Sequence, residues 1–301
     1  MQISKFKGLG VAMVTPFKEN GDVDFEGLEK LTEFMIKGGV DYLVVQGTTG
    51  ESPVLSKEEK QQVLDTVCKV NNARVPVVFG IGGNNTAAVV NDLLSFNLTK
   101  VDGILSASPY YNKPTQEGIY AHYKSIAGAT TLPVIIYNVP GRTASNITAE
   151  TTLRLAKDFS NMIAVKEASG NMEQIMDIIQ NKPDNFLVIS GDDAITLPIL
   201  AAGGDGVISV VGNAFPNQFS QMVNAAMKND MEKARKYHYG VLPIISPLFQ
   251  EGNPGGIKEA LAELNIIESH LRLPLVNVSD KLKNHIQELT RNIYSKFPYQ
   301  N

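Results

Sequence analysis

The chain has 301 residues, of which 43% are hydrophobic, and carries 27 basic against 31 acidic residues, a formal net charge of −4. Such a chain can bury a large core, and it shows neither a basic stripe for nucleic acid nor an apolar run of about 20 residues for a membrane, so we expect neither partner. One cysteine, Cys68, excludes an internal disulfide and a cysteine metal cluster, and is compatible with the cytoplasmic location that we expect.

Eight short apolar runs follow one another along the chain, with helical segments between them. Each run is continuously apolar rather than alternating, as is typical of parallel strands covered on both faces. The first helical segments span residues 25–37, 57–71 and 86–98, and Ser56 with Glu59 forms a capping box before the second. The runs are residues 10–14, 42–46, 77–81, 103–107, 134–137, 163–166, 187–190 and 207–211. This alternation predicts an α/β fold, a (β/α)8 TIM barrel, with a doubly wound open sheet as the alternative.

After the eighth run the pattern becomes helical, at residues 216–228, 231–248, 256–264 and 280–297. The only further strand-like segment is 273–278. We therefore predict a catalytic barrel domain over residues 1–225 and a helical C-terminal extension over residues 226–301.

Chemistry in such a barrel is located at the carboxyl ends of the strands. Lys166 closes the apolar run Met162-Ile163-Ala164-Val165-Lys166-Glu167. A lysine amine in apolar surroundings favours the neutral form, which can attack a carbonyl carbon and form a Schiff base. The alternative for Lys166 taken alone is a solvated surface lysine paired with Glu167.

Other strand ends add groups that suit a keto acid. Residues 47–52, Gly-Thr-Thr-Gly-Glu-Ser, could bind a small carboxylate through backbone N–H groups or simply form a tight turn before a helix. Residues 108–114 place Tyr110 and Tyr111 at the barrel mouth, and Tyr137 precedes Arg142 by five positions. An amine, a phenol that transfers protons and a guanidinium that binds carboxylates form a plausible active site.

No cofactor is expected from the sequence. The four histidines, at positions 122, 238, 270 and 285, lack the spacing of metal ligands. Residues 80–83, Gly-Ile-Gly-Gly, lack the full dinucleotide-binding pattern. A lysine imine is itself an electron sink, so neither a metal nor an organic cofactor is needed.

Along nearly its whole length the chain resembles the class I aldolase-type lyases that include dihydrodipicolinate synthase and N-acetylneuraminate lyase. The resemblance is carried by residues 47–51 (Gly-Thr-Thr-Gly-Glu), 137–140 (Tyr-Asn-Val-Pro) and 165–167 (Val-Lys-Glu). Residues 108–114 and Arg142 resemble the dihydrodipicolinate synthase branch in particular. A sialic acid lyase, or another pyruvate-dependent aldolase of keto-deoxy sugar acids, is the alternative. A keto-acid-binding regulator without turnover is a third possibility, which the intact Lys166, Tyr137 and Thr48 set disfavours.

The resemblance implies that Lys166 forms an imine with pyruvate, which becomes an enamine and attacks L-aspartate-4-semialdehyde to give 4-hydroxy-tetrahydrodipicolinate. It implies a proton relay of Tyr137, Thr48 and Tyr111. Pyruvate would be held by Thr49 and the Ile208 backbone, and the semialdehyde carboxylate by Arg142. Gly191 would line the pocket.

The resemblance also implies a homo-oligomer, a dimer of dimers in which Tyr111 enters the neighbouring subunit's relay. In lysine-sensitive members, two histidines follow the Gly-Thr-Thr-Gly-Glu motif and a glutamate stands four residues beyond an asparagine. Here these positions are Lys57, Lys60 and Ala88, the last four past Asn84. We expect weak or absent inhibition by L-lysine, because its ammonium group would lack a carboxylate partner and no local anion replaces it.

Overall fold

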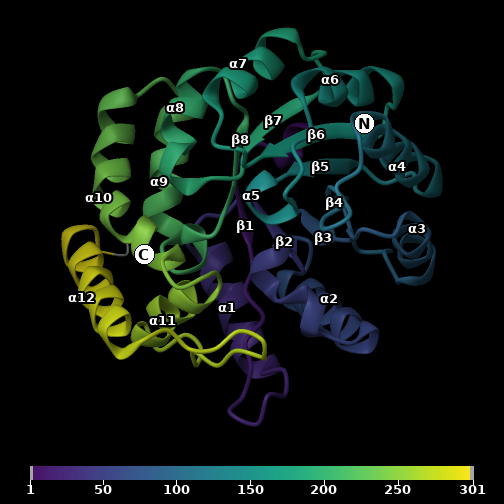
Figure 1. Cartoon of the computed structure of the whole chain (residues 1–301). Coiled ribbons are helices and arrows are strands. Elements are labelled where there is room, and N and C mark those ends of the chain that lie inside the picture. The colour runs from purple at the N-terminus through teal and green to yellow at the C-terminus, as the bar shows by residue number, and fades with distance from the viewer. Residues whose placement is uncertain (1–2, 299–301) are drawn as a thin grey trace.

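The computed structural model describes residues 3–298, which form a closed barrel of eight parallel strands in the order β1 to β8, with β8 pairing back onto β1 (Figure 1). This confirms the predicted (β/α)8 fold. The strands are β1 Gly8–Ala12, β2 Tyr42–Val45, β3 Val77–Gly80, β4 Gly103–Ala107, β5 Val134–Asn138, β6 Met162–Glu167, β7 Leu187–Ser190 and β8 Gly206–Ser209.

The first strand begins two residues earlier than its apolar pattern indicated, and the last ends at Ser209 instead of residue 211. The earlier start falls at Gly8, which carries no apolar signal, whereas β8 ends early because Val211 already belongs to a short 3₁₀ helix, Val211–Asn213. Gly8 pairs with Gly206 where the sheet closes, and a Cβ on Gly206 would lie 2.3 Å from the Gly8 carbonyl oxygen. Only glycine allows the two backbones to approach this closely.

Helices surround the barrel on its outer side, and short side chains cap several of them. Ser56 and Glu59 form the expected capping box of α2, and Thr115 and Thr148 cap α4 and α6. The third helix ends at Ser95, three residues before the predicted end. The helices are α1 Phe25–Lys37, α2 Lys57–Asn71, α3 Thr86–Ser95, α4 Gln116–Ala129, α5 Pro140–Thr143, α6 Ala149–Asp158, α7 Met172–Asn181, α8 Thr196–Ala201, α9 Pro216–Met227, α10 Met231–Phe249, α11 Gly255–Glu263 and α12 Asp280–Lys296.

Strand side chains divide between two apolar layers. One cluster fills the barrel interior and includes Ala164, Ile189 and Ile208, whereas Val165 belongs to the larger cluster that contains the apolar helix residues. Successive residues of a strand point to opposite faces. A residue two positions after Ala164 therefore points into the barrel mouth, and its neighbour points toward the helices.

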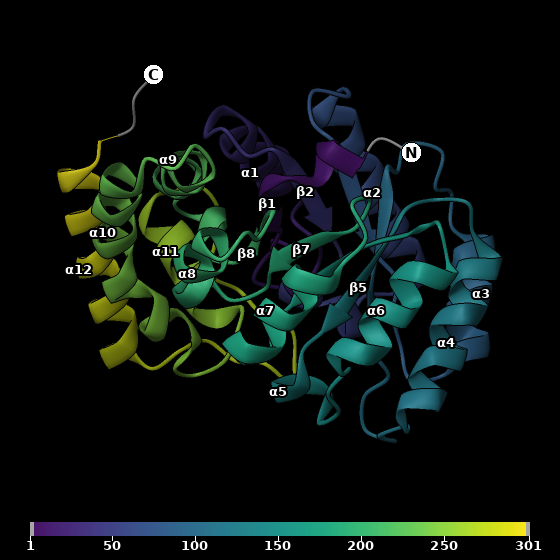
Figure 2. The same ribbon diagram turned by 90° about the horizontal axis from the view of Figure 1, so that it is seen from above.

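The C-terminal helices α10, α11 and α12 pack together on one flank of the barrel, away from α3 and α4 (Figures 1 and 2). Residues 273–278 form an irregular segment without a strand. The expected boundary at residue 225 falls inside α9, which contacts both β1 and α10, so a separate extension stays a prediction. Within residues 3–298, no helix is long and apolar enough to cross a membrane.

Candidate active site

Lys166 lies near the carboxyl end of β6 and points into the barrel interior. Its exposed fraction is 4%, and its Nζ atom lies 4.3 Å from the centre of the Tyr137 ring. Tyr137 is its register partner on β5. Because both side chains point into the barrel from adjacent strands, the strand register fixes the contact between the amine and the phenol.

Glu167 points the other way, toward the helices, and is fully buried. The Asn138 side-chain amide donates to both carboxylate oxygens at 3.1 Å, and the Gln174 amide and the Ser169 backbone N–H donate at 3.0 and 2.8 Å. The carboxylate therefore has its own donors. In the described part of the chain Lys166 forms no ion pair, so the interpretation of Lys166 as a surface lysine paired with Glu167 is wrong.

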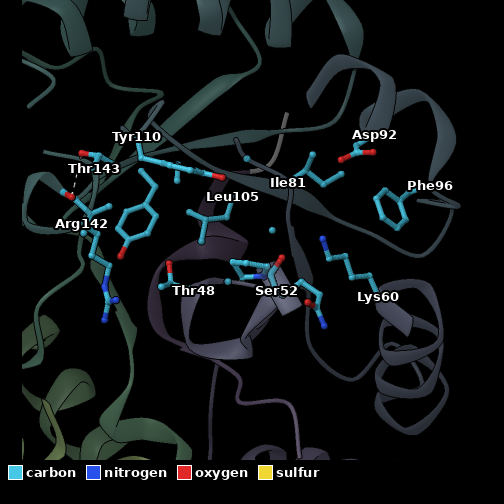
Figure 3. Close-up of a pocket in the computed structure, with 18 residues that line it drawn as sticks. Thr48, Ser52, Lys60, Ile81, Asp92, Phe96, Leu105, Tyr110, Arg142 and Thr143 are labelled. Carbon is cyan, nitrogen blue, oxygen red and sulfur yellow. Dashed lines mark hydrogen bonds between the residues drawn. The ribbon is translucent and has the colours of Figure 1, made fainter. Parts of the chain in front are cut away.

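A pocket of about 270 Å³ opens at the barrel mouth (Figure 3). Thr48, Tyr137 and Arg142 line its inner part, which brings together three of the predicted site residues. Its outer part extends between α2 and α3, where Lys60 and Asp92 line it. The predicted phenol and guanidinium thus share one cavity.

The turn after β2 is a short 3₁₀ helix, Thr48–Gly50. Thr48 is exposed to the pocket, whereas Thr49 is 3% exposed and its hydroxyl accepts a hydrogen bond from the Asn253 side-chain amide at 3.0 Å. Thr15 donates to the Gly50 carbonyl at 2.7 Å. The motif is therefore a fixed turn, and its two threonines face different surroundings.

Gly191 and Ile208 lie on the side of Lys166 opposite Tyr137. A Cβ on Gly191 would lie 3.1 Å from Cε and Cγ of Lys166 and 2.7 Å from Cβ of Ala168, so a larger residue would press on the lysine. Ile208 belongs to the interior cluster on β8. The buried carboxylate of Asp193 accepts from the backbone N–H groups of residues 210 and 211 at 3.0 Å, which fixes the chain after β8. Burial raises the pKa of Asp193, although these donors and Ser209 oppose the rise.

Tyr111 is a predicted site residue that lies exposed on the loop after β4. It is 87% exposed, it has a left-handed backbone with φ of 71°, and it is absent from the pocket lining that includes its neighbour Tyr110. Asn84 holds the loop, since its amide donates to the Tyr110 carbonyl and its own carbonyl accepts from Asn112. A large phenol displayed on a tethered loop is suited to contact something outside this chain.

The sequence patterns did not identify two residues that support this site, Asn253 and Lys258. Lys258 is fully buried in α11 and its ammonium donates to the Glu51 carboxylate at 2.6 Å. A lysine within the mostly apolar run Gly255–Glu263, and an acidic residue without an assigned partner in the Gly-Thr-Thr-Gly-Glu motif, were the available signals. Among residues 3–298, no group of three or more His, Cys, Asp or Glu side chains could hold a metal ion.

A buried amine at the end of the sixth strand of a (β/α)8 barrel, beside a phenol, places the chain among the lyases of the Schiff-base class. The chain belongs to the dihydrodipicolinate synthetase family, whose model matches residues 5–293.

Relatives and solved structures agree with this assignment. The 4-hydroxy-tetrahydrodipicolinate synthase of Flavobacterium psychrophilum is 52% identical over 288 residues, which cover 96% of this chain and 98% of that protein. The crystal structure of dihydrodipicolinate synthase from Aquifex aeolicus matches with a TM-score of 0.92 and 40% identity, over 98% of this chain and 100% of that one. A monomeric dihydrodipicolinate synthase variant matches equally well, with a TM-score of 0.92 and 39% identity, over 98% of this chain and 97% of that one.

Proposed function

We propose that the chain condenses pyruvate with L-aspartate-4-semialdehyde to give 4-hydroxy-tetrahydrodipicolinate, in the route to diaminopimelate and lysine. The observation that carries this proposal is the Lys166 amine, which is buried, has no ionic partner among the described residues and lies against Tyr137. An amine held in this way is available as a nucleophile. Membership in the family, and the names of its relatives, supply the substrates.

The reaction begins with attack of the neutral Lys166 amine on C2 of pyruvate, followed by loss of water to give an imine. Removal of a proton from the methyl carbon gives an enamine. The enamine carbon forms a carbon–carbon bond with the aldehyde carbon of the semialdehyde, whose oxygen takes up a proton. The amino group of the semialdehyde then attacks the imine carbon and releases Lys166, which closes the ring. No step requires a metal or an organic cofactor, because the imine nitrogen accepts the electron pair.

We propose a role for each neighbour of the Lys166 amine. Tyr137, whose ring lies against the Lys166 amine, donates and accepts protons, and Thr48 joins it in the pocket lining. Arg142 lines the same pocket, where its guanidinium is suited to the semialdehyde carboxylate. The Thr49 turn and the backbone at Ile208 hold pyruvate, and Gly191 leaves room for the lysine and its imine.

Cleavage of N-acetylneuraminate is the competing activity of this fold. Arg142 in the pocket favours an acidic aldehyde over a neutral sugar chain, because its exposed guanidinium can pair with a carboxylate and gains no ion pair from an uncharged chain. The names of the relatives agree with the first activity.

A coupled assay tests the proposal directly. The protein is supplied with pyruvate and L-aspartate-4-semialdehyde, and in parallel with N-acetylneuraminate. We expect turnover with the first pair and none above background with the sugar acid. Turnover of the sugar acid alone would reject the proposed substrates, and activity with neither would reject the catalytic function.

We also propose a cytoplasmic homo-oligomer, a dimer of dimers, in which Tyr111 completes the relay of a neighbouring subunit. The support is the 87% exposure of this phenol on a loop held by Asn84. An aromatic ring exposed to this extent is typical of an interface. A dihydrodipicolinate synthase variant described as monomeric has the same fold, so fold alone does not decide the assembly.

Mixing a Tyr111 variant of lowered activity with an inactive Lys166 variant tests the crossing of Tyr111. Tyr111→Phe should lower kcat more than it weakens pyruvate binding, because it deletes a hydroxyl and keeps the ring. In mixed dimers with Lys166→Ala, one of the two sites regains both intact residues, so activity should return after subunit exchange. Tyr110→Phe mixed with Lys166→Ala is the control. No recovery despite demonstrated exchange would reject the crossing.

A further inference from the structure

Glu51 and Lys258 form an ion pair that is withdrawn from solvent at both ends. The exposed fractions of the two side chains are 1% and 0%, and the Lys258 ammonium lies 2.6 Å from a Glu51 carboxylate oxygen. Burying an ion pair generally stabilises a fold no better than packing apolar side chains of the same volume. The position of this pair therefore calls for a reason other than stability.

Both side chains of the pair also contact other protein groups. The Lys258 ammonium also donates to the His270 carbonyl at 2.7 Å and lies 4.3 Å from the centre of the Phe17 ring. The second Glu51 oxygen accepts from the backbone N–H of Arg272 at 3.2 Å. Burial lowers the pKa of Lys258 to about 8, while the charge of Glu51 opposes this and that of Arg272 adds to it. The pair is thus a fixed junction between α11 and the turn after β2.

Glu51 is the residue at which that turn ends. Its backbone is left-handed, with φ of 53° and ψ of 32°, a conformation that is unfavourable for a residue other than glycine. Its N–H donates to the Thr48 carbonyl at 3.2 Å. A side chain locked by Lys258 on one oxygen and Arg272 on the other holds this backbone in place, and the backbone in turn orients Thr48 and Thr49.

A second contact from the same segment reaches the turn two residues earlier. The Asn253 amide donates to the Thr49 hydroxyl at 3.0 Å, and Asn253 lies just before α11, five positions from Lys258. The charged ends of Glu51 and Lys258 are buried and bonded to each other, to the His270 carbonyl and to the Arg272 N–H, so neither offers a free group to a substrate. The Asn253–Thr49 and Lys258–Glu51 contacts therefore both connect α11 and the residues before it to the turn that carries Thr48.

We propose that the Glu51–Lys258 pair is a positioning device for the keto-acid site: it fixes the Thr48–Thr49 turn in the orientation that binds the pyruvate carboxylate. Helix α11, remote in sequence from the barrel strands, is then part of the substrate site. This inference rests on the proposed function, because it assumes that pyruvate binds at this turn.

The test is the double variant Glu51→Gln/Lys258→Met, which removes both charges and keeps the side-chain volumes. Pyruvate binding is read from borohydride trapping of the imine as a function of pyruvate concentration. We expect the half-saturating pyruvate concentration to rise about tenfold to a hundredfold, the loss expected when hydrogen bonds to a charged ligand are misplaced. The KM for the semialdehyde, which Arg142 binds, should change less than twofold.

The matched control is Glu259→Gln/Lys283→Met. It removes the ion pair that joins the next residue of α11, Glu259, which is also buried, to Lys283 of α12 at 3.8 Å. This pair points away from the turn, so half-saturation by pyruvate should stay within twofold of the native value. A pyruvate half-saturation that is unchanged in a folded Glu51→Gln/Lys258→Met protein would overturn the inference, as would equal losses for both substrates.

A milder variant decides the matter if the double variant does not fold. Glu51→Asp keeps the charge and shortens the side chain by one methylene group, so it should raise the half-saturating pyruvate concentration by about threefold to tenfold, a fraction of a charged hydrogen bond. No shift in Glu51→Asp would equally overturn the inference. Failure of the native protein to be trapped with pyruvate would instead reject the proposed function, so the two failures are distinguishable.

Discussion

Two lysines of this chain are almost completely withdrawn from solvent, and their surroundings differ in one decisive respect. Lys258 in α11 has a carboxylate at 2.6 Å, a carbonyl at 2.7 Å and an aromatic ring against it. Lys166 on β6 lies against the ring of Tyr137 and has no carboxylate partner among residues 3–298, since the adjacent Glu167 is held by Asn138 and Gln174 on the other face of the strand. Burial is common to both, so the partner distinguishes them.

The comparison shows how a barrel strand separates two neighbouring charges. Because successive side chains point to opposite faces, Lys166 and Glu167 adjoin in sequence but cannot meet. Lys258 in α11 is not kept apart from a carboxylate in this way, because its side chain extends to Glu51 in the turn that follows β2. The carboxylate of Glu51 opposes the loss of the Lys258 proton and joins this amine to the turn, whereas the Lys166 amine, without such a partner among residues 3–298, is free to react.

The largest expected effect is at the unpaired lysine. Borohydride added with pyruvate should inactivate the native protein irreversibly and label Lys166, whereas Lys166→Arg should lose the label and essentially all turnover. Arginine keeps the charge, but its guanidinium stays protonated and forms no imine. Peptide mass spectrometry measures the label. Lys60→Arg, in the outer part of the same pocket, is the control and should keep it. Undiminished labelling of Lys166→Arg would remove this residue from the mechanism.

Sequence patterns could predict the reactive lysine and not the supporting one. The apolar run that ends at Lys166 predicts a strand, and eight such runs predict a barrel whose strand ends converge, so local information suffices. The contact between Glu51 and Lys258 joins residues 207 positions apart. It depends on how α11 docks against the barrel, which no periodic pattern records. The left-handed backbone of Tyr111 could not be predicted for a related reason, since it is set by the loop's contacts and a tyrosine rarely adopts it.

A methyl group placed beside Lys166 should produce the next largest effect. Gly191→Ala would put a Cβ at 2.7 Å from Ala168 and 3.1 Å from the lysine side chain, which displaces the amine from its position beside Tyr137. We expect kcat/KM for pyruvate to fall by about tenfold to a hundredfold, because a shift of about 1 Å in a reacting group has effects of this size. Steady-state kinetics measures the change.

Gly128→Ala in α4 is its control. A Cβ there meets no atom within 4 Å, and alanine favours a helix over glycine, so activity should be unchanged and stability equal or slightly higher. Native activity in Gly191→Ala would show that the space around the amine is not restricted as the structure indicates.

The lowered pKa of Lys258 should make the free energy of unfolding depend on pH. Burial lowers the pKa of Lys258 from an ordinary 10.5 to about 8. Between these values the unfolded chain binds the extra proton, so the native state gains stability as the pH rises from 8 toward 10.5, and carries the full cost of the buried charge below pH 8. Relative to Glu51→Gln/Lys258→Met, the free energy of unfolding of the native protein should rise by about 1 to 3 kcal/mol over that window.

Urea unfolding of both proteins at pH 7, 8, 9 and 10 measures this difference. The comparison between the two proteins cancels the titration of the other lysines and tyrosines, which they share. A difference that stays constant across these pH values would mean that Lys258 keeps its ordinary affinity for protons despite its burial.

The smallest expected effect is inhibition by L-lysine, and it depends on Lys60, a half-buried lysine near the Asp92 carboxylate in the pocket lining. Lys60 lines the outer part of the pocket together with Asp92, whose charge raises the pKa of Lys60 against the larger lowering effect of burial (Figure 3). The expectation that no local anion replaces the carboxylate missing at Ala88 is therefore wrong, because Asp92 lies one helical turn further along α3. Lys57 is engaged elsewhere, as it donates to Ser95 at 2.6 Å.

We nevertheless expect inhibition by L-lysine to be weak or absent, since Lys60 already offsets the charge of Asp92 and repels a second ammonium group. At an effective dielectric constant near 20, one charge interaction at about 4 Å is worth roughly 4 kcal/mol before screening, so a repulsion from Lys60 largely cancels an equally close attraction to Asp92. Steady-state rates at saturating pyruvate, titrated with L-lysine, measure the effect, and clear partial inhibition at low-millimolar lysine would contradict it. Lys60→Met frees Asp92 and should increase sensitivity to L-lysine, whereas Lys60→Arg, which keeps the charge, should not. Combining Ala88→Glu with Lys57→His and Lys60→His should increase the sensitivity further. This triple variant adds a second carboxylate and removes both ammonium groups.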